Sequence, residues 1–395
     1  MNILLVLTDQ YSADALSCAG NPYLATPALD ALAARGTRFT NAYCTQPLCT
    51  PSRASLMTGR MPTEVGVTRN EQALDTFEAT MPRIFGAAGY DCGYAGKWHL
   101  PELAVPEESG FRNLHGPFDD GLVEACHAFV KEPRDRPFLL VASFTEPHGI
   151  CQWARGQVPP SGPVPAGEWP PLLPNHGVGG YDAELPRIAQ AAQPHSYPTA
   201  TWTEDDWRAY RHAYYRLVER ADAMVGRLLD AVDLDDTFVV FSADHGDQVG
   251  AHRWNQKWVL HEECLSVPLI TSTGGGVVED RLVSNGLDVL PMLAAAAGIA
   301  GLPAVRRDAV FSETEWVVPG IQHLTGRSVR TEHFRYTCYA WGRHREQLFD
   351  LRTDPGELVN LATTEQYGQV LREHRDLLRA HVQATRDRFV RFLPA

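Results

Sequence analysis

The sequence feature with the most chemical content is a cysteine followed two and four residues later by a proline and an arginine. Residues 49–53 read Cys-Thr-Pro-Ser-Arg, and Ala-Ser-Leu-Met-Thr-Gly follows. Thr50 can cap a helix, Pro51 suits its first position, and Gly59 can end it. We therefore expect Cys49 at the positive end of a helix, with Arg53 about one turn beyond. A thiol placed there can meet an anion; the alternative is a small apolar cysteine at a helix end.

Polar side chains follow two apolar runs of the sequence, 3–7 and 238–242. They are Asp9, Gln10, Asp244 and His245. Because sites in α/β sheets gather beyond the carboxyl ends of strands, the four are expected to converge on one hard cation. Carboxylate and amide oxygens suit Ca²⁺, Mg²⁺ or Mn²⁺, and an imidazole suits Mn²⁺ better than Ca²⁺. The alternative for the first pair is a simple turn or helix cap.

Several cations and imidazoles lie close to these motifs in the sequence. Lys97 and His99 are two residues apart, so they point to one side of an extended segment. His148 follows the apolar run 138–144, and Lys257 lies in a tryptophan-rich loop. Each could instead be a surface lysine or a core histidine.

Composition restricts the partners. The 395-residue chain carries a formal net charge of −13, which disfavours nucleic acids and anionic membranes. An anionic substrate would therefore need local positive charge, for which the candidates are Arg53, Lys97 and Lys257. The eight cysteines are scattered without a CxxC pair, so no disulfide framework is expected. The first residues read as a strand and not as a signal peptide, and no run is long enough to span a membrane, which together predict a cytoplasmic protein.

Apolar runs alternate with amphipathic stretches over most of the chain. The expected strands are 3–7, 90–95, 138–144, 238–242 and 267–271, and the expected helices are 27–35, 81–88 and 207–232. This alternation predicts an α/β sandwich with a large, mostly parallel central sheet flanked by helices, over residues 1–303. The Pro- and Gly-rich segment 159–198 is interpreted as a lid or specificity insertion.

The hydrophobic pattern of the sequence changes after about residue 303. Short runs at 310–313, 328–330, 335–339 and 347–351 read as antiparallel strands, and a long amphipathic helix follows at 365–388. Residues 304–395 are therefore predicted to form a small C-terminal α+β subdomain.

These motifs together resemble one family. Cys-x-Pro-x-Arg at 49–53, the block Gly-Tyr-Asp-Cys-Gly-Tyr-Ala-Gly-Lys-Trp-His at 89–99, and Asp-His-Gly-Asp at 244–247 match the type I sulfatases of the alkaline phosphatase superfamily in order and spacing. Leu-Phe-Asp-Leu at 348–351 and Asp-Pro-Gly-Glu-Leu at 354–358 also fit. The resemblance covers nearly the whole chain and implies an alkaline phosphatase-like sandwich.

The resemblance also implies a reaction. The protein would hydrolyse a sulfate monoester of an aryl or carbohydrate alcohol, after a maturase has oxidised Cys49 to formylglycine. One divalent ion, Ca²⁺ first and Mn²⁺ or Mg²⁺ as alternatives, would be held by Asp9, Gln10, Cys49, Asp244 and His245. The catalytic and substrate-binding residues would be Arg53, Lys97 and Lys257 at the sulfate, His99 and His148 as acid and base, Asp244 as proton acceptor, and Asn70 as a polar substrate contact. A second hydroxyl on the hydrated aldehyde would let sulfate leave, which a serine or cysteine ester could not do.

Two positions depart from the commonest family pattern. Many members carry two consecutive aspartates where Asp9-Gln10 stand, and an asparagine in place of His245. The versions found here resemble the choline sulfatase and phosphonate monoester hydrolase branch. Hydrolysis of a phosphonate monoester or phosphodiester therefore stays as the alternative function, and a non-catalytic binding protein as a third. Oligomerisation of identical chains is left open.

Overall fold

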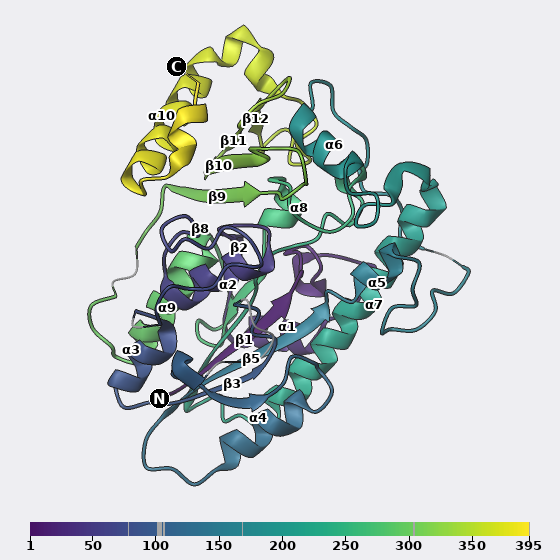
Figure 1. The fold of residues 1–395 in the computed structure, drawn as a ribbon. Helices are drawn as coiled ribbons and strands as arrows, with labels where there is room; N and C mark the ends of the chain where they lie inside the picture. Colours follow the sequence, from purple (N-terminus) through teal and green to yellow (C-terminus); the bar gives the residue numbers. More distant parts are fainter. Residues whose placement is uncertain (78, 101–104, 106, 168, 303–304, 395) are drawn as a thin grey trace.

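The computed structural model describes residues 1–77, 79–100, 105, 107–167, 169–302 and 305–394. A sheet of eight strands, in the order β4-β3-β5-β1-β6-β7-β2-β8, forms its centre (Figure 1). The strands are β1 Asn2–Asp9, β2 Thr37–Tyr43, β3 Asp91–Gly96, β4 Arg112–His115, β5 Phe138–Pro147, β6 Thr237–Ala243, β7 Leu269–Thr271 and β8 Val277–Ser284. Only β7 runs antiparallel to its neighbours, which confirms the mostly parallel sheet.

All five predicted apolar runs overlap strands of this sheet. Strands β2, β4 and β8 carry polar residues on a face that is not buried, so they lack the continuous apolar run that marks β1, β5 and β6. β1 lies between β5 and β6, and its residues 3–7 are fully buried. The centre of the sheet was therefore readable from hydrophobicity, whereas its edges were not.

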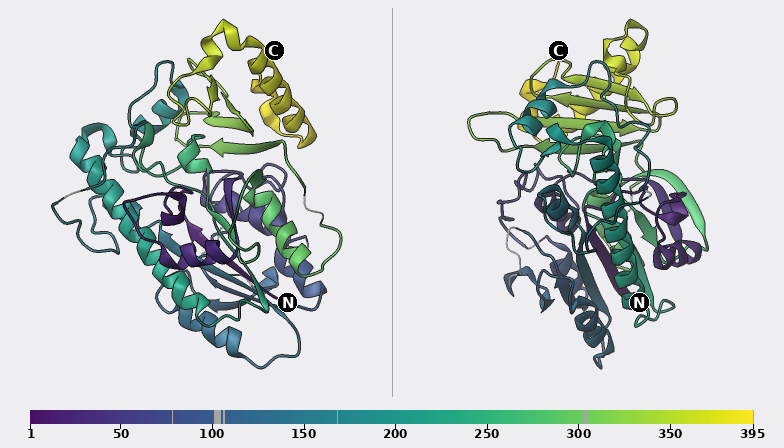
Figure 2. Two further views of the ribbon diagram at one scale, coloured as in Figure 1. Left: turned by 180° about the vertical axis from the view of Figure 1, so that it is seen from behind. Right: turned by 90° about the vertical axis from the view of Figure 1, so that its right-hand side faces the viewer.

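Helices cover both faces of the sheet (Figure 2). The helices are α1 Pro27–Arg35, α2 Cys49–Thr58, α3 Met81–Ala87, α4 Leu122–Lys131, α5 Ile150–Ala154, α6 Glu184–Ala191, α7 Glu204–Leu229, α8 Glu262–Leu265, α9 Asn285–Ala296 and α10 Gly368–Ala384. One layer is built around α7, which packs against α1, α4 and α5; in the other, α2 packs against α9 and α3. α7 begins three residues before its predicted start because Thr203 and Asp206 form a reciprocal capping box.

The C-terminal residues form a second, four-stranded antiparallel sheet covered by α10. Its strands are β9 Ala309–Glu315, β10 Thr325–Thr331, β11 Phe334–Tyr339 and β12 Glu346–Asp350. The sheet and helix share a separate apolar core that includes Val329, Tyr336, Leu348 and Leu378. The helix is shorter than predicted, because 3-10 turns occupy 365–367 and 388–392. The predicted boundary at 303/304 lies outside the described residues.

One buried arginine links the two sheets. Arg335 of β11, 0% exposed, pairs with Glu262 of α8 and places Nε 2.7 Å from Oε1 of Glu357. Glu357 lies in the C-terminal region itself, so the pair with Glu262 is the one that ties this region to α8. Among the described residues, no helix is both long and apolar enough to cross a membrane. All eight cysteines are free thiols, as expected.

Candidate active site

The predicted metal ligands meet where β1 and β6 end side by side. The amide of Gln10 donates to Asp244 Oδ1 at 3.1 Å, and His245 Nε2 lies 3.6 Å from Asp244 Oδ1 and 3.8 Å from Asp9 Oδ1. All four residues are 0% exposed. Asp9, Cys49, Asp244 and His245 each offer a ligand atom within 4.8 Å of the others. Two carboxylates and an imidazole in this arrangement form a donor set for a divalent cation.

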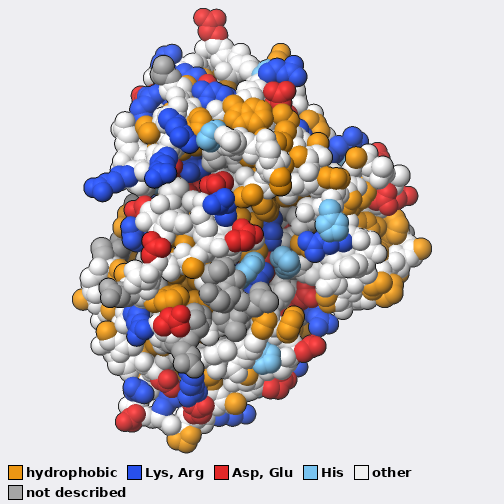
Figure 3. Space-filling model, in the orientation of Figure 1, with side chains coloured by type: hydrophobic (Ala, Val, Ile, Leu, Met, Phe, Trp, Pro, Cys, Tyr) orange, Lys and Arg blue, Asp and Glu red, His pale blue; other side chains and the backbone are white. Residues whose placement is uncertain are grey.

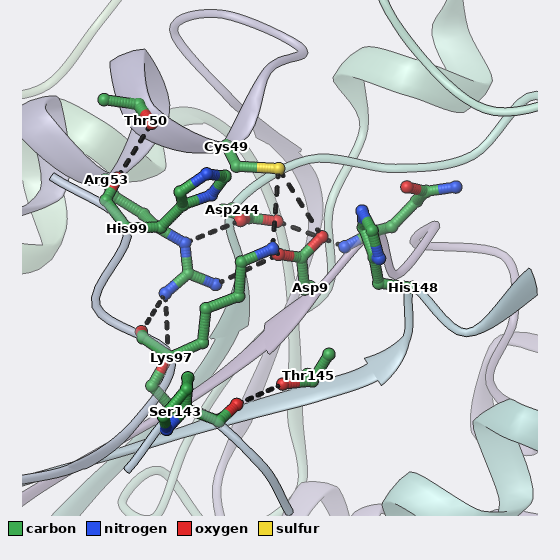
Figure 4. Close-up of polar contacts among 12 residues, drawn as sticks. Asp9, Cys49, Thr50, Arg53, Lys97, His99, Ser143, Thr145, His148 and Asp244 are labelled. Carbon is green, nitrogen blue, oxygen red and sulfur yellow. Dashed lines mark hydrogen bonds and ion pairs between the residues drawn. The ribbon is translucent and has the colours of Figure 1, made fainter. Parts of the chain in front are cut away.

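Cys49 begins helix α2 and lies above these carboxylates (Figure 4). The predicted cap is wrong: Leu48 occupies the cap position, and Thr50 lies inside the first turn. Its hydroxyl contacts the backbone carbonyls of Asn70 at 3.0 Å and His99 at 2.8 Å, while its amide donates to the Asn70 side chain at 3.1 Å. Thr50 therefore fastens the start of α2 to two neighbouring loops. The predicted end at Gly59, with φ 67°, is confirmed.

The Cys49 sulfur is surrounded by positive charge. Lys257 Nζ lies 3.1 Å away, His245 Nε2 3.4 Å and Lys97 Nζ 3.8 Å. Burial and Asp9 oppose ionisation of the thiol, yet Lys257, Lys97 and His245 outweigh them and hold its pKa well below the ordinary value. Position 49 is therefore built to carry a negatively charged side-chain atom.

Arg53 lies behind the sulfur and pairs with both carboxylates. Its Nε is 2.9 Å from Asp244 Oδ2 and its Nη2 3.4 Å from Asp9 Oδ2. Its Nη1 donates to the Lys97 carbonyl at 2.6 Å and to Ser143 Oγ at 2.8 Å. With its donors used by the protein, Arg53 orients the carboxylates and does not line the cavity.

A cavity of about 400 Å³ opens above the sulfur. Figure 3 shows histidine and basic side chains gathered around a hollow near the middle of one face. Six predicted residues line it: Cys49, Asn70, Lys97, His99, His148 and Lys257. The other lining residues are Leu48, Pro117, Phe118, Thr145, Cys151, Arg155, Gln193, Ser196, Tyr197, Gln256 and Trp258. The end of the 159–198 segment thus contributes Gln193, Ser196 and Tyr197 to the wall.

The two predicted acid/base histidines lie on opposite sides of the sulfur (Figure 4). His99, with φ 59°, has a buried Nδ1 that finds no hydrogen-bond partner among the described residues. His148 Nε2 lies 3.9 Å from Cys151 Sγ. Burial, and then Lys257 and Lys97, hold the pKa of His148 well below its ordinary value. His148 is therefore neutral at neutral pH.

Asp247 ends the Asp-His-Gly-Asp motif at 244–247, but no role was predicted for it. It is 0% exposed, and its Oδ2 accepts from Gln10 Nε2 at 2.6 Å and from the Tyr210 hydroxyl at 2.9 Å. Burial raises the pKa of Asp247 to about 6. By taking the Gln10 amide nitrogen, Asp247 fixes which way the side-chain amide points. Its position three residues after Asp244 was the only sequence signal.

Three tryptophans in or near the 159–198 segment lie outside the cavity. Trp153 and Trp202 pack edge to face with ring centroids 5.2 Å apart, and Trp169 Nε1 donates to a backbone carbonyl. None of the three lines the cavity, whereas Trp258 does. In the sequence, the signal that could have identified Trp258 is its position directly after the predicted site residue Lys257.

Comparison with known proteins identifies the family of this chain. A family model described as Sulfatase matches residues 1–299. The Delta 4,5-hexuronate-2-O-sulfatase of Bacteroides thetaiotaomicron is 29% identical, over 98% of this chain and 89% of that protein. Human arylsulfatase A is 31% identical, over 86% of this chain and 71% of that protein. A solved structure of a 2-O GAG sulfatase superposes with a TM-score of 0.87 at 27% identity, covering 98% of this chain and 93% of that one. The chain belongs to the sulfatase family.

Proposed function

We propose that this protein hydrolyses a carbohydrate sulfate monoester, releasing sulfate and the sugar alcohol. The observation that carries the proposal is the position of Cys49 at the floor of the cavity, between the carboxylates and the two lysines. The relatives named for a hexuronate 2-O-sulfate and for GAG support a sugar substrate.

We propose one divalent cation at Asp9, Gln10, Asp244, His245 and the side chain at 49, with Ca²⁺ as the first candidate. The donor set fits a cation, because two buried carboxylates converge there and Lys97 already pairs with Asp9. When bound, the ion lowers the pKa of the nucleophile and offsets charge on the sulfuryl oxygens. The imidazole of His245 leaves Mn²⁺ as the competing candidate.

Maturation of Cys49 to formylglycine by a separate enzyme is part of the proposal. The hydrated aldehyde supplies a hydroxyl for attack on sulfur and a second one through which sulfate is released. The mass of the peptide containing residue 49, isolated from active protein, tests this. Active protein with an intact thiol at Cys49 would contradict it.

The chain's own residues then have distinct tasks. Lys97 and Lys257 bind the sulfuryl oxygens, since both line the cavity beside position 49. His148 holds a proton for the departing alcohol once the bound anion has raised its pKa, and His99 accepts one from the second hydroxyl. Asp244 accepts the first proton, and Arg53 keeps both carboxylates oriented.

A substrate series tests the reaction itself. Oxidised protein is offered sulfated monosaccharides, 4-nitrophenyl sulfate, choline sulfate and a phenyl phosphonate ester. Highest kcat/KM on a sugar sulfate is the expected outcome. Preference for the phosphonate ester would favour the alternative reaction, and turnover of none would favour a binding protein.

The free thiols also bear on location. Eight unpaired cysteines are typical of a reducing compartment, so we propose the cytoplasm. Fractionation of cells expressing the native gene tests this.

A further inference from the structure

A second cavity lies on the C-terminal subdomain, outside the site described above. It measures about 490 Å³. We call it the arginine groove and define it by Arg386, Arg388, Arg391, His323 and Trp316, which all line it. Figure 3 shows basic side chains gathered on the upper part of the face, over this subdomain.

The three arginines that define the groove share its wall with two carboxylates, Asp387 and Glu315, and Oε1 of Glu315 lies 3.8 Å from Nε of Arg69. All three are exposed, and within the described part of the chain none forms an ion pair with a carboxylate. The other arginine in the wall, Arg327, differs, because its Nε lies 2.6 Å from Oδ2 of buried Asp387. On a molecule with a net charge of −13, three unpaired guanidinium groups in one groove form a local positive site.

The groove adjoins the active-site cavity through two contacts. Trp316 in its wall stacks on Trp258 in the cavity wall, with ring centroids 6.3 Å apart and planes at 28°. The Thr314 hydroxyl donates to the Trp258 carbonyl at 2.6 Å. Residues 66 and 68 line the groove, and Asn70, two residues on, lines the cavity. The groove and the active-site cavity therefore lie on either side of the Trp258–Trp316 pair.

We propose that the arginine groove binds further anionic groups of an oligosaccharide whose sulfated sugar occupies the active site. Guanidinium groups recognise sulfate and carboxylate oxygens through paired hydrogen bonds, and the exposed His323 provides a ring surface for sugar. The ligand class is an anionic oligosaccharide, with either sulfates or uronate carboxylates as the contacting groups. The inference rests on the proposed function for the ligand's first sugar.

Binding measured without turnover tests the groove separately from the reaction. The protein left unconverted at Cys49 is titrated with a heparin hexasaccharide, with the same hexasaccharide after desulfation, and with inorganic sulfate. The test variant combines Arg388→Ala and Arg391→Ala, and the matched control is Arg372→Ala, an exposed arginine of α10 outside the groove. The Kd for the heparin hexasaccharide should rise at least tenfold in the double variant and less than twofold in the control.

Two readouts separate the possible outcomes. Unchanged thermal unfolding and unchanged kcat/KM on 4-nitrophenyl sulfate in the converted double variant exclude damage to fold or active site. A weakening seen equally with the desulfated hexasaccharide assigns the contacts to carboxylates, and one confined to the sulfated probe assigns them to sulfates. An unchanged Kd in the double variant, or no hexasaccharide binding by the wild-type protein, overturns the proposal. If the Kd for the heparin hexasaccharide rises in the double variant but no sulfate ester is hydrolysed, the proposed reaction is contradicted and the proposed groove is not.

Discussion

Replacing Lys257 by methionine removes one positive charge beside the reacting centre while keeping most of the side-chain volume. Lys257 Nζ lies 3.1 Å from Cys49 Sγ and 3.9 Å from Asp9 Oδ1, and the residue is 5% exposed. Burial would lower the pKa of Lys257, but Cys49 and Asp9 raise it above its ordinary value. The ammonium is therefore charged throughout the assay range, and its loss is a loss of charge at any pH.

The size of the effect follows from that distance and burial. Two unit charges about 4 Å apart interact by about 4 kcal/mol at an effective dielectric constant of about 20. Part of this is already present in the ground state, because the sulfate ester is itself an anion. The remainder matches the roughly 2–4 kcal/mol found for single transition-state stabilisers, so kcat/KM should fall about 30- to 1000-fold.

The assay is kcat/KM on a series of aryl sulfates with different leaving groups, normalised to the fraction of Cys49 converted, which mass spectrometry measures. The fall should be equal across the series, because Lys257 is proposed to contact the sulfuryl group and not the alcohol. Trp258→Phe is the neighbouring control and should change the order of preference among alcohols instead. A loss below about fivefold for Lys257→Met, or one confined to poor leaving groups, would refute the placement of this lysine.

Three further outcomes are expected. Asp244→Asn should lower bound divalent metal at least tenfold by elemental analysis, since one of two converging carboxylates is lost; full occupancy would place the ligands elsewhere. Burial raises the pKa of Glu146 from 4.5 to about 7, so the folded state keeps a proton that the unfolded chain loses. The free energy of unfolding therefore declines as the pH rises above 4.5, by on the order of 3 kcal/mol at pH 8. Glu146→Gln should raise the unfolding temperature at pH 8 and not at pH 4.5, and an equal shift at both would contradict that titration. In metal-free, unconverted protein, iodoacetamide at pH 6 should label Cys49 before Cys151, because burial raises the pKa of Cys151 to about 11. If mass spectrometry found Cys151 labelled first, the lysines would not ionise Cys49.

The sequence by itself determined the centre of the fold and the chemistry of the site. Residues 3–7 are apolar on both faces, as are 138–144 apart from Ser143, and such runs are typical of buried strands in a parallel sheet. Polar residues directly after strands in such a sheet fall at one edge, so Asp9 and Asp244 could be placed together without coordinates. Local spacing also located the end of α2 at Gly59.

Only the tertiary structure decided what surrounds that centre. The start of α2 differed from the local signal because Thr50 bonds to loops distant in sequence. Trp258 lines the cavity and Trp153 does not. Packing between loops decides this difference, because the residue type is the same. The arginine groove likewise joins residues near 68, 316 and 388, which no local pattern connects. Periodicity and spacing report interactions a few residues apart, whereas these features depend on contacts formed only when the two sheets pack together.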